Sequence, residues 1–165
     1  MKSVILVRHA KSSWDAPGIP DIDRPLNDRG KHDCPMMAKR LLEKKVTIDA
    51  FLSSPARRAK KTATLFAEEY KIEKDKLILI PELYQAEPQT FYAVIAQAPS
   101  HADHIALFSH NPGITEFANM LTAMKVDDMP TCAVFAVQAD IKSWHEFQNA
   151  HKEFCFFDYP KSLTM

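Results

Sequence analysis

The chain has 165 residues, a length that suits one domain with a sizeable core. Basic and acidic residues balance at 21 each, which argues against a basic nucleic-acid surface. The three cysteines are odd in number and widely spaced, which argues against a disulfide framework or a zinc site. Only three glycines occur, and none of them has the spacing of a glycine-rich nucleotide loop. A phosphate group would therefore have to be held by side chains and helix N-termini.

No segment predicts a membrane span or a secretory leader. The apolar run at 4–7 is too short for a signal peptide, and no run approaches the ~18 apolar residues of a transmembrane helix. We expect one soluble, cytoplasmic domain over residues 1–165, with no membrane partner. No pattern in the sequence indicates an oligomeric state.

The first half of the chain alternates between buried strands and amphipathic helices. Strands are predicted at 4–7, 50–52 and 77–80, because short uninterrupted apolar runs are typical of strands covered on both faces. An apolar stripe at helical spacing over 34–42 predicts a helix, which either starts near Asp33 or is kinked by Pro35. A second stripe over 59–70 predicts another helix, with Ser54 as its N-cap and Pro55 at its first position.

The second half continues the alternation and then changes character. A helix is predicted at 91–98 after Pro88, a buried strand at 105–108, and a helix at 114–121 with Asn111 as its N-cap. The segments 131–137 and 154–159 are rich in β-branched and aromatic residues and should close the sheet. This order predicts an α/β three-layer sandwich, with a mostly parallel central sheet flanked by helices.

Polar residues follow the predicted parallel strands. In open α/β sheets, ligands bind beyond the carboxyl ends of the strands. The first strand is followed by Arg8 and His9, the second by Arg57 and Arg58, and the fourth by His110. Two histidines and at least two arginines beside helix N-termini suit a phosphoryl group, which needs fixed hydrogen-bond donors.

Helical phase separates the two neighbouring arginines. At about 100° per residue, Arg57 lies opposite the apolar stripe through Ala59 and Ala63, whereas Arg58 borders it. We therefore expect Arg58 to bind the ligand and Arg57 to face solvent.

Three motifs in this order resemble the histidine phosphatase (phosphoglycerate mutase-like) superfamily. The motifs are Arg8-His9-Ala10, Ser54-Pro55-x-x-Arg58-Ala59-x-x-Thr62-Ala63 and His110-Asn111-Pro112. The segments Arg8-His9-Ala10-Lys11-Ser12 and Asp21-x-Asp23-Arg24-Pro25-Leu26-Asn27-x-x-Gly30 resemble its SixA-like phosphohistidine phosphatase branch. The likeness spans residues 1–121 and implies the phosphoglycerate mutase-like fold.

The resemblance also implies roles for individual residues. His9 would be the nucleophile, held in one tautomer by a carbonyl or carboxylate on its other ring nitrogen. Arg8, Arg58 and His110 would bind the phosphoryl oxygens, without a metal or another cofactor. The substrate-binding candidates are Lys11, Ser12, Gln85 and Asn111, of which Lys11 and Ser12 fit a solvated loop equally well.

The general acid is where this chain departs from the family. The carboxylate expected after the third strand aligns with Gln85, which leaves Glu82, Glu87 or no residue at all; Glu82 is preferred because it is nearer the strand end. A phosphohistidine substrate needs little acid catalysis, because its imidazole leaving group has a conjugate acid of pKa about 6.5. The expected substrate is therefore a phosphohistidine protein or another activated phosphoryl compound.

Other functions remain open on the sequence. A small-molecule phosphomonoesterase acting on a phosphorylated metabolite is one alternative, and a phosphate-binding regulatory module with little turnover is another. Trp14 is expected either to line the substrate entrance or to fill a surface gap. Asp21, Asp23 and Arg24 should brace the loop after His9 through an ion pair. His101 and His104 should belong to a surface loop rather than to a metal site.

Overall fold

Six strands form one mixed sheet in the computed structural model, which describes residues 1–14 and 17–162. The strand order across the sheet is β3-β2-β4-β1-β5-β6. The first four strands of this order run parallel, so the sheet is mostly parallel as predicted, and β5 and β6 pair antiparallel at one side. Their bounds are β1 (Lys2–Arg8), β2 (Ala50–Ser53), β3 (Ile78–Leu79), β4 (His104–Ser109), β5 (Val134–Ala139) and β6 (Glu153–Asp158).

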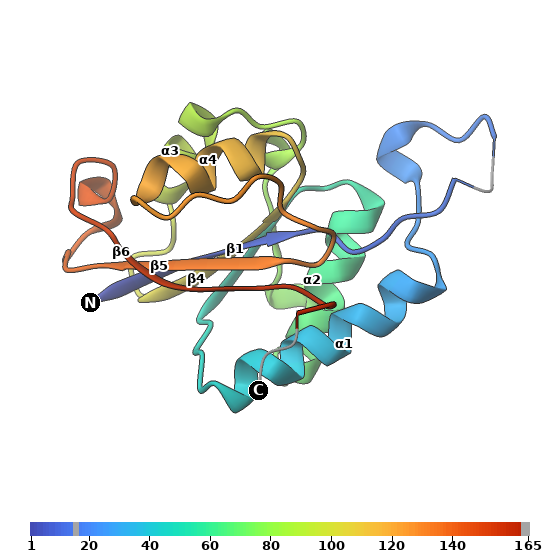
Figure 1. Ribbon diagram of the computed structural model, residues 1–165, viewed down its shortest axis with the longest axis horizontal. Helices are drawn as coiled ribbons and strands as arrows, with labels where there is room; N and C mark the ends of the chain where they lie inside the picture. Colours follow the sequence, from blue (N-terminus) through green and yellow to red (C-terminus); the bar gives the residue numbers. More distant parts are fainter. Residues whose placement is uncertain (15–16, 163–165) are drawn as a thin grey trace.

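Helices cover both faces of the sheet (Figure 1). The helix pair α1 (Asp28–Glu43) and α2 (Arg57–Glu69) packs on one face, and the pair α3 (Pro88–Ala96) and α4 (Gly113–Leu121) packs on the other. Short 3-10 turns connect these elements at η1 (Asp21–Asp23), η2 (Lys74–Lys76), η3 (Pro81–Leu83) and η4 (Trp144–Glu146). The predicted three-layer α/β architecture is confirmed.

The alternating faces of β1 explain why its apolar run is uninterrupted. Val4 and Leu6 belong to the core cluster under α3 and α4, whereas Ile5 and Val7 belong to the cluster under α1 and α2. All four side chains are at most 1% exposed. Burying an aliphatic side chain of this size contributes about 1.5–3 kcal/mol, so both layers are anchored on this central strand.

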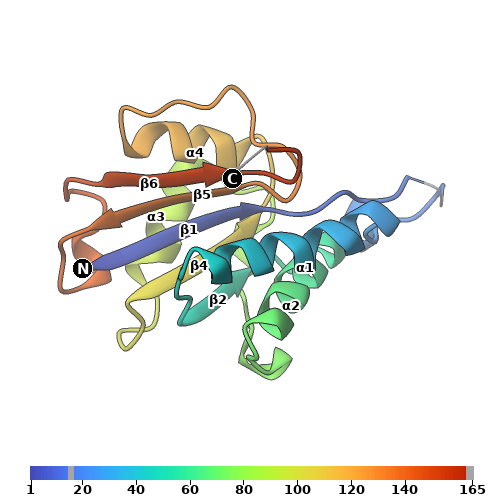
Figure 2. The same ribbon diagram turned by 60° about the horizontal axis from the view of Figure 1, so that its bottom comes forward.

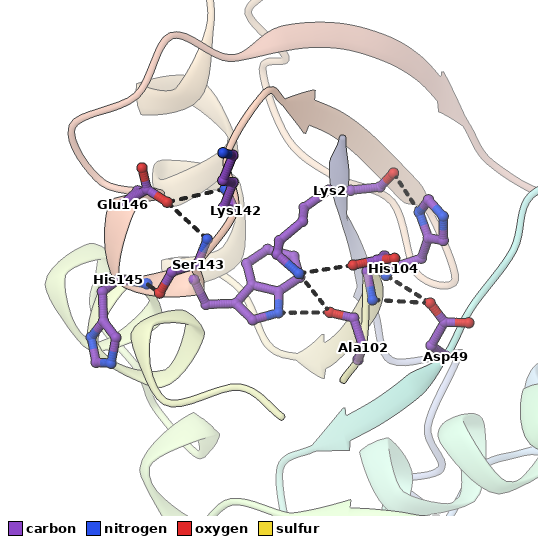
Figure 3. A network of polar contacts seen from close by, with 11 residues as sticks. Lys2, Asp49, Ala102, His104, Lys142, Ser143, His145 and Glu146 are labelled. Atoms are coloured by element: carbon purple, nitrogen blue, oxygen red, sulfur yellow. Dashed lines mark hydrogen bonds and ion pairs between the residues drawn. The ribbon is translucent and has the colours of Figure 1, made fainter. Parts of the chain in front are cut away.

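A polar network lies at the end of the sheet where β1 begins (Figure 3). The Lys2 ammonium is 5% exposed and donates to an Asp103 carboxylate oxygen at 2.9 Å and to the Ala102 carbonyl at 3.3 Å. The Trp144 indole N–H donates to the same carbonyl at 2.9 Å. These contacts are structural, and they lie at the end of the sheet opposite to the carboxyl ends of the parallel strands.

Two predicted strands differ from the observed ones. The segment 77–80 is not a buried strand: only Ile78 and Leu79 pair, on the outer edge of β2, and they are 37% and 41% exposed. The strand predicted at 131–137 begins at Val134, because Cys132 adopts a left-handed φ of 63° and Ala133 closes a turn onto the Pro130 carbonyl.

The predicted helix starts need three corrections. Helix α1 begins at Asp28, capped by the Asn27 side chain, and continues through Pro35. Ser54 does not cap α2, whose N-cap is Ala56; the Ser54 hydroxyl accepts from the Ala56 N–H at 3.2 Å and lies 2.8 Å from a ring nitrogen of His110. Asn111 does not cap α4, whose N-cap is Pro112.

The segment that joins β1 to α1 extends beyond the carboxyl end of β1 (Figures 1 and 2). Ser12 and Leu26 pair as an isolated antiparallel bridge at its base. Gly30 lies so close to this segment that a Cβ on it would be 2.3 Å from the Lys11 carbonyl oxygen. A side chain larger than hydrogen therefore does not fit between α1 and the residues after His9. In the part of the chain that the structure describes, no helix meets the length and hydropathy needed to span a bilayer.

Candidate active site

A cavity of about 820 Å³ opens at the carboxyl ends of β1 and β4. It contains every sequence-predicted site residue except Glu82. The lining residues are Arg8, His9, Lys11, Ser12, Trp14, Asp21, Arg24, Arg58, Tyr84, Gln85, Ala86, Glu87, Pro88, His110, Asn111, Pro112, Gly113, Glu116 and Thr131. The predicted convergence of the strand ends on one site is thus seen in the structure.

His9 is held with one ring nitrogen free to react. It follows β1 and is 7% exposed, and its Nδ1 lies 2.7 Å from the carbonyl oxygen of Ala10. Because a carbonyl can only accept, Nδ1 carries the proton and Nε2 carries the lone pair. Burial lowers the pKa of His9 to about 3, against the opposing effect of the Ala10 hydrogen bond. The ring is therefore neutral near pH 7, as an attacking nitrogen must be.

Two buried arginines, Arg8 and Arg58, lie beside the histidines of the cavity. The Arg8 guanidinium donates through Nη1 to the Met129 carbonyl at 2.7 Å, and burial lowers its pKa while the Asp128 carboxylate opposes this. Arg58, on the first turn of α2, is only 5% exposed, whereas its neighbour Arg57 is exposed. The Nε atoms of Arg8 and Arg58 are buried without a hydrogen-bond partner among the described residues. Such unpaired donors are costly and favour an anion nearby.

His110 lies beside His9 at the end of β4. The two ring centroids are 5.1 Å apart, and His110 Nε2 is 2.8 Å from the Ser54 hydroxyl oxygen. Burial lowers the pKa of His110 to about 4, with the Arg58 charge adding to the effect. The second ring nitrogen, Nδ1, has no hydrogen-bond partner among the described residues.

Thr62 joins the nucleophile loop to the arginine helix. Its hydroxyl is fully buried, accepts from the Ala10 N–H at 3.0 Å and donates to the Arg58 carbonyl at 2.8 Å. The backbone on either side of His9 and Arg58 is therefore tied through one side chain. Thr62 stands in the quoted motif, but only the fold brings it against Ala10.

The segment after His9 reaches back to Arg58 through Asp21. The Arg58 guanidinium donates to the Asp21 carbonyl at 2.6 Å and to its carboxylate at 3.0 Å. Tyr84 donates its hydroxyl to the same carboxylate at 2.6 Å, and Arg24 forms an ion pair with it at 3.3 Å. The Tyr84 hydrogen bond, followed by the Arg58 contact, lowers the pKa of Asp21 to about 2. The predicted brace between Asp21 and Arg24 exists, and it also fixes Arg58.

Sequence reasoning missed Asp21 and Tyr84 as residues that line the cavity. Tyr84 follows the third predicted strand, which was the available signal, whereas nothing local in the sequence places Asp21 beside Arg58. Trp14 lines the cavity at its rim, 73% exposed, with the Arg24 guanidinium 3.6 Å above its ring. Of the two positions expected for Trp14, the entrance of the cavity or a surface gap, the structure shows the first.

Glu82, the preferred candidate for the general acid, lies outside the cavity. Glu82 is exposed in η3 and lines a separate hollow beside β3 and α3. After Glu82 the chain turns, with Gln85 in a left-handed conformation at φ 58°, and this turn brings Gln85 and Glu87 into the cavity. Gly113 makes the turn possible, because a Cβ there would be 1.8 Å from the Ala86 carbonyl oxygen.

The four predicted substrate-binding residues all line the cavity, in different states of engagement. Lys11 and Gln85 have side chains without a hydrogen bond to the described residues, whereas the Ser12 hydroxyl accepts from Arg24 at 2.6 Å. The Asn111 amide nitrogen donates to Asp128 at 2.7 Å and to Met129 at 3.1 Å. Its oxygen accepts from the Thr115 hydroxyl at 2.6 Å, so the Asn111 side chain holds its own loop in place.

Within residues 1–14 and 17–162, no group of three or more His, Cys, Asp or Glu side chains is arranged to hold a metal ion. His104 Nδ1 lies 2.8 Å from the Ser3 hydroxyl, at the edge shown in Figure 3, and His101 is exposed. The cationic side chains that line the candidate site are those of Arg8, Lys11, Arg24 and Arg58.

Comparisons with known proteins agree with this arrangement. The sequence model of the histidine phosphatase superfamily (branch 1) matches residues 4–106, and the chain belongs to this superfamily. Membership supports phosphatase activity. An uncharacterized chloroplastic protein of Arabidopsis thaliana is 29% identical, over 88% of this chain and 70% of that protein.

Solved structures place the chain near one branch of the superfamily. A structure described as the phosphohistidine phosphatase SixA of Agrobacterium tumefaciens is 26% identical, with a TM-score of 0.81 over 96% of this chain and 98% of that one. The protein histidine phosphatase SixA in complex with tungstate is 24% identical, with a TM-score of 0.79 over 96% and 97%. A mycobacterial glucosyl-3-phosphoglycerate phosphatase shares the fold at 11% identity, with a TM-score of 0.67 over 94% and 97%. The fold is that of SixA.

Proposed function

We propose that this protein is a metal-independent phosphatase that removes the phosphoryl group from phosphohistidine in proteins, through an intermediate on His9. The observation that carries the proposal is the tautomer of His9. Its Nδ1–H donates to the Ala10 carbonyl, so its neutral Nε2 is available in a cavity that also contains Arg8, Arg58 and His110. The likeness to SixA supports the choice of substrate.

In the first step, His9 Nε2 attacks the phosphorus atom of the substrate. A bond from Nε2 to phosphorus forms as the bond from phosphorus to the substrate ring nitrogen breaks. The substrate ring, protonated on its other nitrogen, leaves as neutral imidazole. Arg8, Arg58 and His110 bind the three equatorial oxygens, over which negative charge is spread in the transition state.

In the second step, water attacks phosphorus and regenerates the enzyme. The bond from Nε2 to phosphorus breaks, the phosphoryl group takes the oxygen and both protons of the water to leave as H2PO4⁻, and His9 returns to its neutral form. Lys11 and Gln85 contact the substrate around the phosphoryl group. Ser12 and Asn111 hold the loops that line it, through their contacts with Arg24 and Asp128.

Leaving-group chemistry separates this function from a phosphomonoesterase. An alkoxide leaving group has a conjugate acid with a pKa near that of water, ~15.7, and needs a positioned acid. Imidazole, with a conjugate acid of pKa about 6.5, does not. The exclusion of Glu82 from the cavity fits the phosphohistidine substrate.

A small-molecule phosphomonoesterase is the second candidate, because Glu87 lines the cavity. If Glu87 is a general acid, Glu87→Gln will slow hydrolysis of an alkyl phosphate at least 100-fold, the lower range of general acid catalysis. On the phosphohistidine proposal, the same substitution changes phosphohistidine turnover by less than threefold. Equal or better efficiency on the alkyl ester than on a phosphohistidine protein would refute the preferred substrate.

The intermediate can be tested by incubation with a labelled phosphoryl donor, acid or base quenching, and detection of bound label. The expected phosphoenzyme is stable to base, labile to acid and absent from His9→Ala. His151→Ala is the matched control, because His151 is exposed and lies outside the cavity. Turnover without this intermediate contradicts the mechanism, and binding without turnover of any donor favours a phosphate-binding module.

A further inference from the structure

A second hollow, here called the basic groove, lies between the start of α1, the outer face of α2 and the segment around η2. Its volume is about 690 Å³. Its lining residues are Pro25, Leu26, Lys31, Arg57, Lys60, Lys61, Thr64, Lys74, Asp75, Leu77 and Leu79. Five of them are cations and one is a carboxylate, in a chain whose formal net charge is zero.

The charges of the basic groove are not neutralised within the protein. The five cations, Lys31, Arg57, Lys60, Lys61 and Lys74, are all exposed. The side chain of each one lacks an ion pair or hydrogen bond with residues 1–14 and 17–162. Like charges that gather in a concave surface attract anionic partners and raise their association rate.

The basic groove adjoins the catalytic cavity at two places. On the first turn of α2, Arg58 lines the cavity and Arg57 lines the groove. At the base of the β1–α1 segment, Ser12 lines the cavity and its bridge partner Leu26 lines the groove. A polypeptide bound in the groove would therefore lie beside the cavity that contains His9.

We propose that the basic groove binds an acidic polypeptide segment next to the phosphorylated residue of the protein substrate, an inference that rests on the proposed function. Pro25, Leu26, Leu77 and Leu79 add apolar lining beside the cations of the groove. This combination suits a segment with carboxylates and aliphatic side chains. A single-stranded nucleic acid would require aromatic platforms for its bases, and the lining of the groove contains none.

The test compares two phosphohistidine peptides that differ in one segment, which carries six glutamates or six glutamines near the phosphohistidine. Wild-type protein should have a kcat/KM at least tenfold higher on the acidic peptide, through a lower KM. The double variant Lys60→Glu/Lys61→Glu should lose this preference while keeping turnover of free phosphohistidine. The matched control is Lys39→Glu/Lys161→Glu, two exposed lysines outside the groove, which should behave as wild type.

Binding of the unphosphorylated acidic peptide, followed by fluorescence anisotropy, gives a readout independent of catalysis. We expect at least tenfold weaker binding to the groove variant and a smaller salt dependence, because fewer exposed charges are screened. Groove-dependent peptide binding without phosphohistidine turnover would support peptide binding by the groove and refute the proposed phosphatase function. Normal turnover with equal kcat/KM on both peptides would refute the proposed role of the groove and leave the proposed phosphatase function standing. Groove-dependent binding of a single-stranded DNA 12-mer, tighter than that of the acidic peptide, would also overturn it.

Discussion

Replacement of His9 should change the pH dependence of stability in a calculable way. The folded protein lowers the pKa of His9 to about 3, mainly through burial. In the unfolded chain the same ring has a pKa near 6.5. As the pH falls below about 6.5, the unfolded state therefore takes up a proton that the folded state does not. Stability is complete above that pH and is lost progressively down to about pH 3.

The size of the effect follows from the gap between the two values. Each pH unit below 6.5 costs about 1.4 kcal/mol, so at pH 4.5 the wild-type protein loses roughly 2.7 kcal/mol through this one ring. His9→Asn removes the titrating group and keeps an N–H that can reach the Ala10 carbonyl. The variant should lose about 2.7 kcal/mol less than wild type between pH 7 and pH 4.5.

Urea unfolding at pH 7 and pH 4.5 measures this difference. His110 titrates in both proteins, so its contribution largely cancels. His151→Asn serves as a control, because this exposed histidine should leave the pH dependence as in wild type. An identical loss of stability in wild type and His9→Asn would falsify the neutral, buried state of His9. That result would also remove the main support for its role as nucleophile.

Three further substitutions probe the site through other contacts. Thr62→Val leaves the buried Ala10 N–H without its acceptor, which should cost about 1–3 kcal/mol in urea unfolding and slow turnover, whereas Thr62→Ser should restore both. Gly30→Ala places a Cβ 2.3 Å from the Lys11 carbonyl oxygen and should lower the stability by at least ~2 kcal/mol in thermal unfolding. Glu82→Gln, outside the cavity, should leave kcat on phosphohistidine within twofold of wild type, and a larger loss would argue that Glu82 reaches the substrate.

Much of the architecture is encoded in local patterns and could be predicted from them. The uninterrupted run of β1 and the helical phase at Arg57 and Arg58 depend on spacing alone. Both predictions agree with the structure, where β1 is buried on both faces and only Arg58 turns into the cavity. The convergence of His9 and His110 follows from a general property of parallel sheets.

The errors arose where tertiary partners compete with local preferences. Ser54 is a good N-cap residue by type, but its hydroxyl contacts the ring of His110. The Asn111 side chain is likewise engaged by Asp128, Met129 and the Thr115 hydroxyl rather than by a backbone N–H of the helix it precedes.

The local backbone conformation after β3 determines which glutamate lines the cavity. Distance from the strand end favoured Glu82 over Glu87. The 3-10 turn η3 and the left-handed Gln85 instead leave Glu82 outside the cavity and bring Glu87 into it. The spacing of hydrophobic residues does not predict such a turn. The contact between Asp21 in η1 and Arg58 in α2 joins residues 37 positions apart, and local patterns contain no information about it.

The place of β1 in the sheet makes the site a product of the whole chain. Its side neighbours are β4 and β5, and Ser3 contacts His104 across 101 positions of sequence. His9 therefore comes early in synthesis, but its cavity is complete only after His110 and the segment around Met129 have joined it. Pairing over such separations is slow compared with local structure formation. A nascent chain or an N-terminal fragment ending before β4 would carry the nucleophile with Arg8 and Arg58, but without His110 and without the Met129 carbonyl that holds Arg8. Catalytic activity should therefore depend on completed folding and not on synthesis of the Arg8-His9-Ala10 motif alone.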